Sequence, residues 1–176
     1  MTVEYGLKQA GEKALEQLVD RLVEEARRRG LRASRGGVIQ GIGFSLDAPY
    51  IIAEGLRNRG FIVEKEGEIV LTEYGEGLVE YTVEIAKTLK PYSLFPELDS
   101  GRLVGAILYA LYDWSNSKTA EEILREASET LRLLRELQQK NRDVFKAIAV
   151  LLPRLYFESG KYTPLSLIEE IQATVS

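Results

Sequence analysis

The run of residues 42–78 constrains the fold most, because it carries the signals for a helix, a tight hairpin and a second helix without interruption. A turn signal at residues 43–45 precedes Asp47, a favourable N-cap, and Pro49, which the first helical turn tolerates. Apolar residues then recur at helical spacing up to Gly60, and a glycine often follows the last residue of a helix. This pattern predicts a helix that begins after Asp47 and ends before Gly60.

The residues after Gly60 predict a hairpin. Residues 61–63 and 69–71 are apolar and partly β-branched, which favours strands. The polar tip between them contains Gly67, which can take the positive φ of a tight turn. Thr72 is then placed to cap a helix over about residues 73–90, which Pro91 would stop.

Short motifs in this run follow the order of a known family pattern. In chain order they are Ile-Gly-Phe-Ser at 42–45, Leu56, Gly-Phe-Ile at 60–62, Leu-Thr at 71–72, Gly75 and Leu78. In these motifs the chain resembles, over about residues 5–90, the winged helix-turn-helix domain of MarR-like and PadR-like transcriptional regulators. The resemblance implies a mainly α fold with a small β-hairpin, in which a winged helix-turn-helix is followed by a helical segment.

The chain departs from the family pattern in two places. The helix expected over residues 34–42 contains Gly36, Gly37 and Gly41, and each glycine is about 1 kcal/mol less favourable than alanine inside a helix. The hairpin tip carries three glutamates and one lysine, which is poor chemistry for contact with phosphate. Gly36 and Gly37 are also compatible with a phosphate-binding loop. The Gly-Lys-Ser/Thr ending of such a loop is missing, so a weak helix or a turn is favoured.

The rest of the chain predicts further helices. The first runs from about Val3 or Leu7 to Arg29 with an apolar stripe, and residues 31–33 are a candidate short strand. We therefore divide the chain into a winged domain, residues 1–90, and a helical segment, residues 91–176, which serves for dimerisation. Residues 91–96 form the linker.

In the second half, Ser100 can cap an almost wholly apolar helix over residues 101–113, and Thr119 with Glu122 forms a capping box for the next helix. We favour one long helix from residue 120 to Pro153, where it bends; a break near Asn141 is the alternative. A last short helix is predicted from residue 163 to residue 173.

Apolar residues in the long helical region recur every three or four positions, as in a heptad seam. The seam consists of Leu124, Ala127, Leu131, Leu134, Phe145, Ile148, Leu152 and Leu155. Gln138 and Asn141 fill the middle of the seam and would fix its register. We predict a homodimer held through this half, since palindromic operators are read by two-fold dimers. The alternative is that these helices form the core of a monomer.

Charge is distributed unevenly, although the net charge is only −4. Residues 21–60 hold eight arginines and four acidic residues, whereas residues 61–90 hold three lysines and seven glutamates. The arginines that could bind phosphates and position the protein on a duplex are Arg27, Arg28, Arg29, Arg32 and Arg35. The alternative is that they complement the helix dipole and pair with Glu24 and Glu25. We favour the DNA reading, because five arginines in nine residues exceed what one helix end needs.

The predicted recognition helix offers few side chains for reading bases. Arg57 can pair with guanine and Asn58 with adenine. Tyr50 is more often a packing residue at such a position, and Glu54 would repel phosphate. The full predicted DNA-binding set is Arg27, Arg28, Arg29, Arg32, Arg35, Ser45, Tyr50, Arg57, Asn58 and Lys65.

The chain contains neither histidine nor cysteine, which excludes Ser-His-Asp and Cys-His catalysis, disulfides and the usual zinc sites. We therefore expect no enzyme and no cofactor. The alternating Glu64, Glu66 and Glu68 leave an all-carboxylate cation site as an alternative, but a solvated hairpin is favoured. No apolar run reaches the roughly 18 residues of a membrane span, and no secretory signal is visible, so we expect a cytoplasmic protein. The fourteen arginines, against nine lysines, fit a thermophile.

Two functions remain. The first is a DNA-binding transcriptional regulator that acts as a homodimer on double-stranded DNA. The second is a winged-helix protein-interaction module of a larger transcription or chromosome-maintenance assembly. The arginines and the spacing of turn and helix favour the first, which we adopt; the acidic hairpin and the negative net charge favour the second.

Overall fold

Helices and one hairpin account for most of the chain in the computed structural model, which describes residues 2–42, 54–92, 99–111, 118–159, 168–170 and 172–173. The helices are α1 (Thr2–Arg28), α2 (Arg35–Ile42), α4 (Glu73–Leu89), α5 (Gly101–Leu111), α6 (Ala120–Lys140) and α7 (Arg142–Ser159). The strands are β1 (Ile62–Lys65) and β2 (Glu68–Leu71), and a short 3-10 helix, η1, covers Lys90–Tyr92. A mainly α chain with a small hairpin is therefore confirmed.

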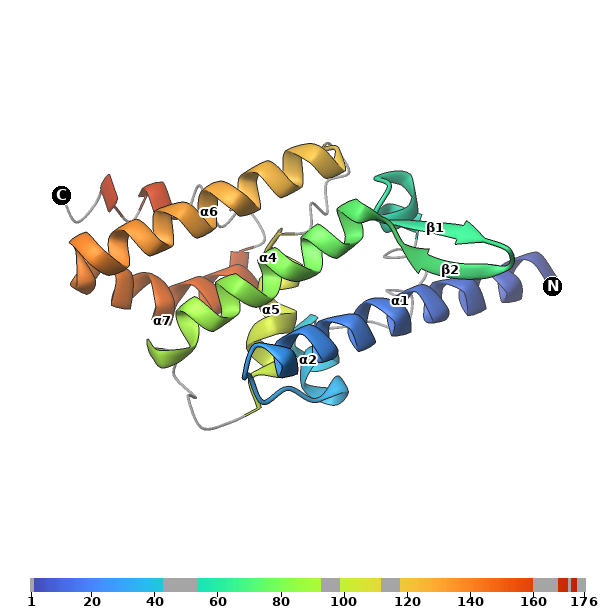
Figure 1. Cartoon of the computed structure of the whole chain (residues 1–176), viewed down its shortest axis with the longest axis horizontal. Helices are drawn as coiled ribbons and strands as arrows, with labels where there is room; N and C mark the ends of the chain where they lie inside the picture. The colour runs from blue at the N-terminus through green and yellow to red at the C-terminus, as the bar shows by residue number, and fades with distance from the viewer. Residues whose placement is uncertain are drawn as a thin grey trace.

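The predicted hairpin is confirmed, and the structure adds its register. Ile62 lies opposite Leu71 and Lys65 opposite Glu68, so the turn contains only Glu66 and Gly67. Both turn residues have positive φ, 53° and 81°, which is the geometry of a type I′ turn. Strand β2 lies against α1, and Figure 1 shows the hairpin reaching along the N-terminal part of that helix.

The predicted helix ends beside the hairpin are also confirmed. Residues 54–58 are helical, and Gly60 follows them with φ of 83°. Thr72 caps α4: its side chain accepts a hydrogen bond from the Gly75 amide at 3.3 Å, and its hydroxyl donates to the carbonyl of Gly60. Helix α4 ends at Leu89, and Pro91 lies in η1 directly after it. The predicted turn at residues 43–45, Asp47 and Pro49 fall outside the described residues.

The glycine-rich helix α2 forms because it packs backbone to backbone against α5. A Cβ atom added to Gly41 would lie closer than 3.0 Å to the Arg102 carbonyl oxygen, and one added to Gly105 would come equally close to the Val38 carbonyl oxygen. Glycines four residues apart on both helices, 37 and 41 against 101 and 105, therefore permit a contact that side chains would prevent. This contact outweighs the low helix propensity of α2.

A single carboxylate ties the starts of α2 and α5 together. Asp99 Oδ1 accepts hydrogen bonds from the amides of Ser34 at 2.9 Å and Gly101 at 2.8 Å, and Asp99 Oδ2 accepts from the Ser34 hydroxyl. The Ser100 amide donates to the carbonyl of Arg32 at 2.7 Å. The prediction of a short strand at residues 31–33 is wrong, because the backbone there bonds to the start of α5 instead of to a strand. Ser100 precedes α5 as predicted, but the side chain that accepts from Gly101 belongs to Asp99.

The prediction of one long helix after residue 120 is wrong, and the alternative break at Asn141 is confirmed. Asn141 has φ −145° and ψ 82°, its amide donates to the Leu137 carbonyl at 2.8 Å, and its side-chain oxygen accepts from the Val144 amide at 3.3 Å. One residue thus ends α6 and caps α7. The two helices lie side by side as an antiparallel pair, and α7 continues past Pro153 (Figure 1).

One hydrophobic core runs through both halves of the sequence. Helix α5 packs on α2, α4 and α7, and α4 packs on α6. Within a single chain, Val104, Ile107, Leu108 and Leu111 are no more than 7% exposed. The seam residues Ala127, Leu131, Leu134, Phe145 and Ile148 are buried in the same core. Most of the apolar area that suggested a dimer is therefore covered within one chain, while Leu103 and Leu124 are partly buried. The side chains of Leu152 and Leu155 lie outside the described residues.

Two further observations complete the fold. Residues 168–170 and 172–173 are helical, within the range predicted for the last helix. Across the described ranges, no helix combines the length and the apolar character that crossing a bilayer requires.

Candidate nucleic-acid interface

The helix over residues 54–58 presents three exposed polar side chains, Glu54, Arg57 and Asn58, from a fixed position. Its neighbour Leu56 is 1% exposed, and Phe61, just after the helix, is fully buried. The Phe61 amide donates to the Leu56 carbonyl at 2.9 Å, and the Thr72 amide donates to the Phe61 carbonyl at 3.0 Å. The helix end is thus anchored to the core and to the hairpin, while Arg57 and Asn58 face solvent. The other predicted residues of this region, Ser45 and Tyr50, lie outside the described residues.

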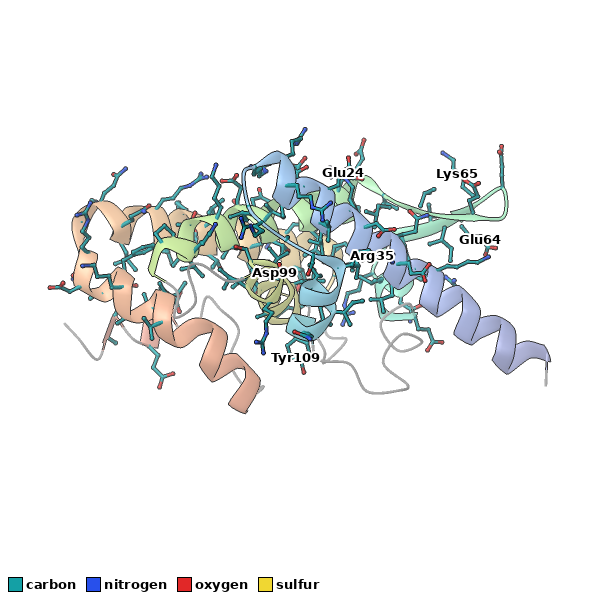
Figure 2. The ribbon with its side chains drawn as sticks, turned by 90° about the horizontal axis from the view of Figure 1, so that it is seen from below. Glu24, Arg35, Glu64, Lys65, Asp99 and Tyr109 are labelled. Carbon is teal, nitrogen blue, oxygen red and sulfur yellow. The ribbon has the colours of Figure 1, made fainter. Side chains whose placement is uncertain are left out.

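The hairpin is acidic and its single lysine faces a carboxylate. Lys65 lies directly opposite Glu68 in the register, and both are exposed. Figure 2 shows Glu64 and Lys65 on the projecting hairpin. Glu64 pairs with Ile69, so Glu64 and Glu68 stand on opposite faces of the hairpin instead of the one face that their alternation suggested. No group of three acidic side chains in the described ranges is placed to hold a metal ion.

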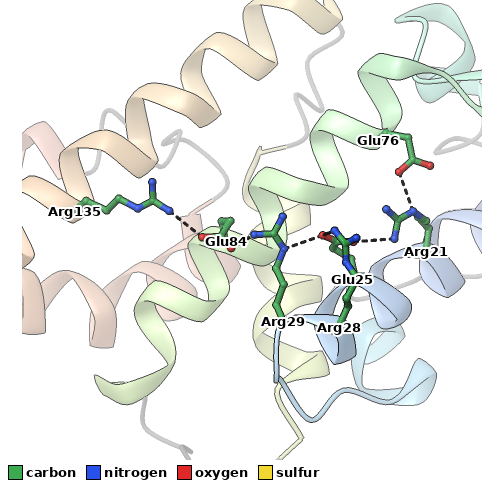
Figure 3. A network of polar contacts seen from close by, with 7 residues as sticks. All are labelled: Arg21, Glu25, Arg28, Arg29, Glu76, Glu84 and Arg135. Carbon is green, nitrogen blue, oxygen red and sulfur yellow. Dashed lines mark hydrogen bonds and ion pairs between the residues drawn. The ribbon is translucent and has the colours of Figure 1, made fainter.

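Two of the five predicted phosphate-binding arginines belong to an ion-pair network centred on a buried carboxylate (Figure 3). The carboxylate of Glu25, which is 0% exposed, accepts from Arg28 at 2.7 Å, Arg29 at 2.8 Å and Arg21 at 3.1 Å. Burial alone would raise the pKa of Glu25, but the three guanidinium groups lower it to about 2. The alternative interpretation, in which these arginines pair with Glu25, is confirmed for Arg28 and Arg29.

The network extends from α1 to α4 and α6. Arg21 bonds to Glu76 on α4 at 2.8 Å. Glu84, also on α4, accepts from Arg29 on α1 and from Arg135 on α6, the latter at 2.9 Å. Four arginines and three glutamates therefore join three helices, which gives these arginines a structural role.

The other three arginines of the predicted set differ from one another. Arg35 pairs with Asp20 at 2.9 Å, and both side chains are more than half exposed. Arg27 donates to the carbonyl of Ala33 at 3.1 Å, which orients the guanidinium without neutralising its charge. Arg32 is exposed. Within the described part of the chain, neither Arg27 nor Arg32 takes part in an ion pair.

The structure adds a cation that the sequence analysis missed. Arg102 is exposed, and it follows Ser100, whose amide bonds to the Arg32 carbonyl. Arg32 and Arg102 are 70 residues apart in the sequence (102 − 32). Neither hydrophobic periodicity nor local charge could therefore predict that their segments are in contact. The repeated glycine spacing at 37/41 and 101/105 is the one signal that could have predicted the contact between α2 and α5.

Comparisons of this chain with protein-family models, curated proteins and solved structures gave no match. The winged-helix resemblance therefore rests on the motifs of residues 42–78 and on the hairpin and helix ends that surround them.

Proposed function

We propose that this chain is a DNA-binding transcriptional regulator that contacts double-stranded DNA through the helix ending at Arg59 and acts as a homodimer. The observation that carries the proposal is the exposure of Arg57 and Asn58 on a helix end that Leu56 and Phe61 anchor in the core. Arginine and asparagine are the side chains best suited to bidentate contact with guanine and adenine in the major groove. A fixed helix end gives such contacts a defined register.

The hairpin has a minor role in this proposal. Its exposed tip holds Glu64, Glu66 and Glu68 with the single cation Lys65, and the closest cross-strand neighbour of Lys65 is Glu68. Carboxylates at these positions repel phosphates at short range. We therefore assign base contacts to the helix and expect Lys65 to add little affinity.

The test is selection of bound sequences from a random duplex library, followed by binding of the selected site to the variants Arg57→Ala and Asn58→Ala. Each variant should lose about 1–3 kcal/mol on the selected site and show a blurred sequence preference. Arg142→Ala is the matched control, because Arg142 is an exposed arginine at the α6–α7 junction, at the far end of the molecule from the hairpin (Figure 1). Equal losses on selected and random duplexes would show that the helix does not read bases.

The homodimer is tested separately by sedimentation equilibrium of the protein with and without the selected duplex. Two protomers per palindromic site are expected, because two-fold sites are read by two-fold dimers. One protomer per site at saturation would remove the homodimer from the proposal and leave DNA binding in place.

A docking module in a larger assembly is the second candidate. Its support is the hairpin, where an acidic tip adjoins Val63, a valine 43% exposed on the outer face. The acidic tip disfavours phosphates and would suit a basic surface on a partner protein. The absence of detectable binding of the wild-type protein to genomic fragments at low salt would favour this candidate over DNA binding.

A further inference from the structure

Backbone contacts bring together two segments that carry exposed arginines, where α1 ends and α5 begins. We call Arg27, Arg32 and Arg102 the basic corner. Arg27 bonds to the Ala33 carbonyl at 3.1 Å, the Arg32 carbonyl accepts from Ser100 at 2.7 Å, and Arg102 is two residues further on. The corner is held by backbone hydrogen bonds, so its position does not depend on the arginine side chains themselves.

The charge of the basic corner is not balanced by the residues around it. None of its three guanidinium groups forms an ion pair with any residue that the structure describes. Asp99, whose oxygens accept from Ser34 and Gly101, lies near enough to Arg27 for the guanidinium to lower the pKa of that carboxyl. This one carboxylate is outnumbered by the three cations. The arginines at the Glu25 network differ, because three glutamates offset four arginines there.

The exposure of these arginines indicates the kind of anion that they suit. All three side chains are exposed, so they do not enclose a single small anion. Guanidinium groups spread along a surface suit a polyanion with regularly spaced phosphates, where each contact releases counterions. The helix ends of α2 and α5 are already capped by Asp99 and Ser34, so the arginines must supply the attraction.

We propose that the basic corner binds the phosphate backbone of double-stranded DNA, and that Arg102 brings a contact from the second half of the chain. This inference rests on the proposed DNA-binding function and assigns two kinds of DNA contact to two groups of residues. The helix with Arg57 and Asn58 reads bases, whereas Arg27, Arg32 and Arg102 position the protein on the duplex. The acidic hairpin takes no part in positioning.

The experiment measures the affinity for a duplex of fixed sequence as a function of salt. The proteins are the wild type, Arg32→Ala, Arg102→Ala and the double variant. Each lost phosphate contact lowers the slope of log affinity against log salt by about 0.9. Between 50 and 200 mM salt, the fold-loss of affinity of each single variant should therefore be about 3.5 times smaller than that of the wild type. The sequence preference should stay unchanged.

Three further variants make the result specific. Arg102→Lys keeps the charge and should restore the wild-type slope. Arg125→Ala and Arg142→Ala remove exposed arginines from α6 and α7 and should leave the slope unchanged. Thermal unfolding by circular dichroism shows whether each variant is folded, and the exposed positions should leave the midpoint almost unchanged.

The possible failures are distinguishable. If the wild type binds the duplex but Arg32→Ala and Arg102→Ala keep its salt slope, the basic corner is overturned while the proposed function stands. If the wild type binds no duplex at low salt, both proposals fail. If the double variant loses the same amount on single-stranded RNA as on the duplex, the corner binds polyanions generally and duplex DNA is not its specific partner.

Discussion

Among the interfaces that join the first 90 residues to the rest of the chain, two are built in opposite ways. Helices α2 and α5 meet through glycines, with backbone against backbone. Helices α4 and α6 meet through side chains: Leu124 lies near Gly77, Tyr74 donates to Glu121 at 2.8 Å, and Glu84 bonds to Arg135. Side chains can change rotamer when a neighbour changes, whereas two touching backbones can only move apart. We therefore expect the glycine interface to tolerate far less substitution.

The largest expected effect is at Gly105. In Gly105→Ala, the new methyl group would meet the backbone of Val38, Gly41 and Ile42, each closer than 3.0 Å. Overpacking of this kind costs about 3 kcal/mol. This exceeds the ~1 kcal/mol by which alanine is more favourable than glycine in a helix. Urea unfolding gives the free energy directly.

Gly36→Ala is the matched control, because Gly36 lies on the exposed side of α2 with nothing within 4 Å of the added Cβ. This variant should be stabilised by about 0.5–1 kcal/mol. The same substitution on neighbouring helices thus has opposite signs. If Gly105→Ala were as stable as the wild type, the two interfaces would not differ as described.

The second effect concerns a large side chain of the other interface. Leu134 on α6 is fully buried, and Leu134→Ala should lower the free energy of unfolding by about 2–3 kcal/mol through lost contacts and a cavity. Leu134→Met, of similar volume, should cost less than about 1.5 kcal/mol, because the flexible side chain can fill the space. A loss as large for methionine as for alanine would mean that this interface is as rigid as the glycine interface.

The third effect is the dependence of stability on pH at Glu25. The folded-state pKa of Glu25 is about 2, below its ordinary value of 4.5, so the ionised form stabilises the fold. This contribution is present above pH 4.5 and is lost as the pH falls from 4.5 toward 2.

In Glu25→Gln, part of that acid sensitivity should disappear, and stability at neutral pH should fall by about 1–2 kcal/mol, because the partly exposed arginines are screened by solvent. Chemical unfolding between pH 2 and pH 7 tests this. Unchanged acid sensitivity in the variant would assign the loss to other carboxylates.

The smallest effect is at Arg135, whose side chain is 55% exposed although it bonds to Glu84. Arg135→Ala should cost about 0.5 kcal/mol or less, since exposed ion pairs contribute little. Arg142 is exposed and forms no ion pair with the described residues, so Arg142→Ala is the reference for loss of charge alone. A loss of unfolding free energy above ~1 kcal/mol would show that the ion pairs of the network stabilise the fold cooperatively, by more than isolated exposed pairs do.

The elements that the sequence predicted correctly are those with local causes. The type I′ turn follows from Gly67, the cap of α4 from Thr72 and the end of the preceding helix from Gly60, each within a few residues of its effect. The break at Asn141 also has a local cause, but the sequence alone does not predict it. An asparagine can either continue a helix or cap the next one. Its side chain does the latter.

The candidate site was predictable only where its residues depend on local structure. Arg57 and Asn58 lie exposed, as their helical positions suggested. The pairing of Arg28 with Glu25 is local and was the alternative interpretation of the sequence. The place of Arg32 could not be predicted, because its backbone bonds to Ser100, far along the chain. Arg102 enters the candidate interface only because two pairs of glycines bring α5 onto α2.

The shared cap at Asp99 also sets an order of events during synthesis of the chain. Helix α2 has eight residues and three glycines, and isolated helices of that length do not persist in water. Its cap partner Asp99 and its packing partner α5 follow about 65 residues later. At the ribosome, α1 and the hairpin can begin to form while α2 is still unstructured. The segment that leads into the predicted recognition helix is therefore completed late, after the loop to residue 99 has closed.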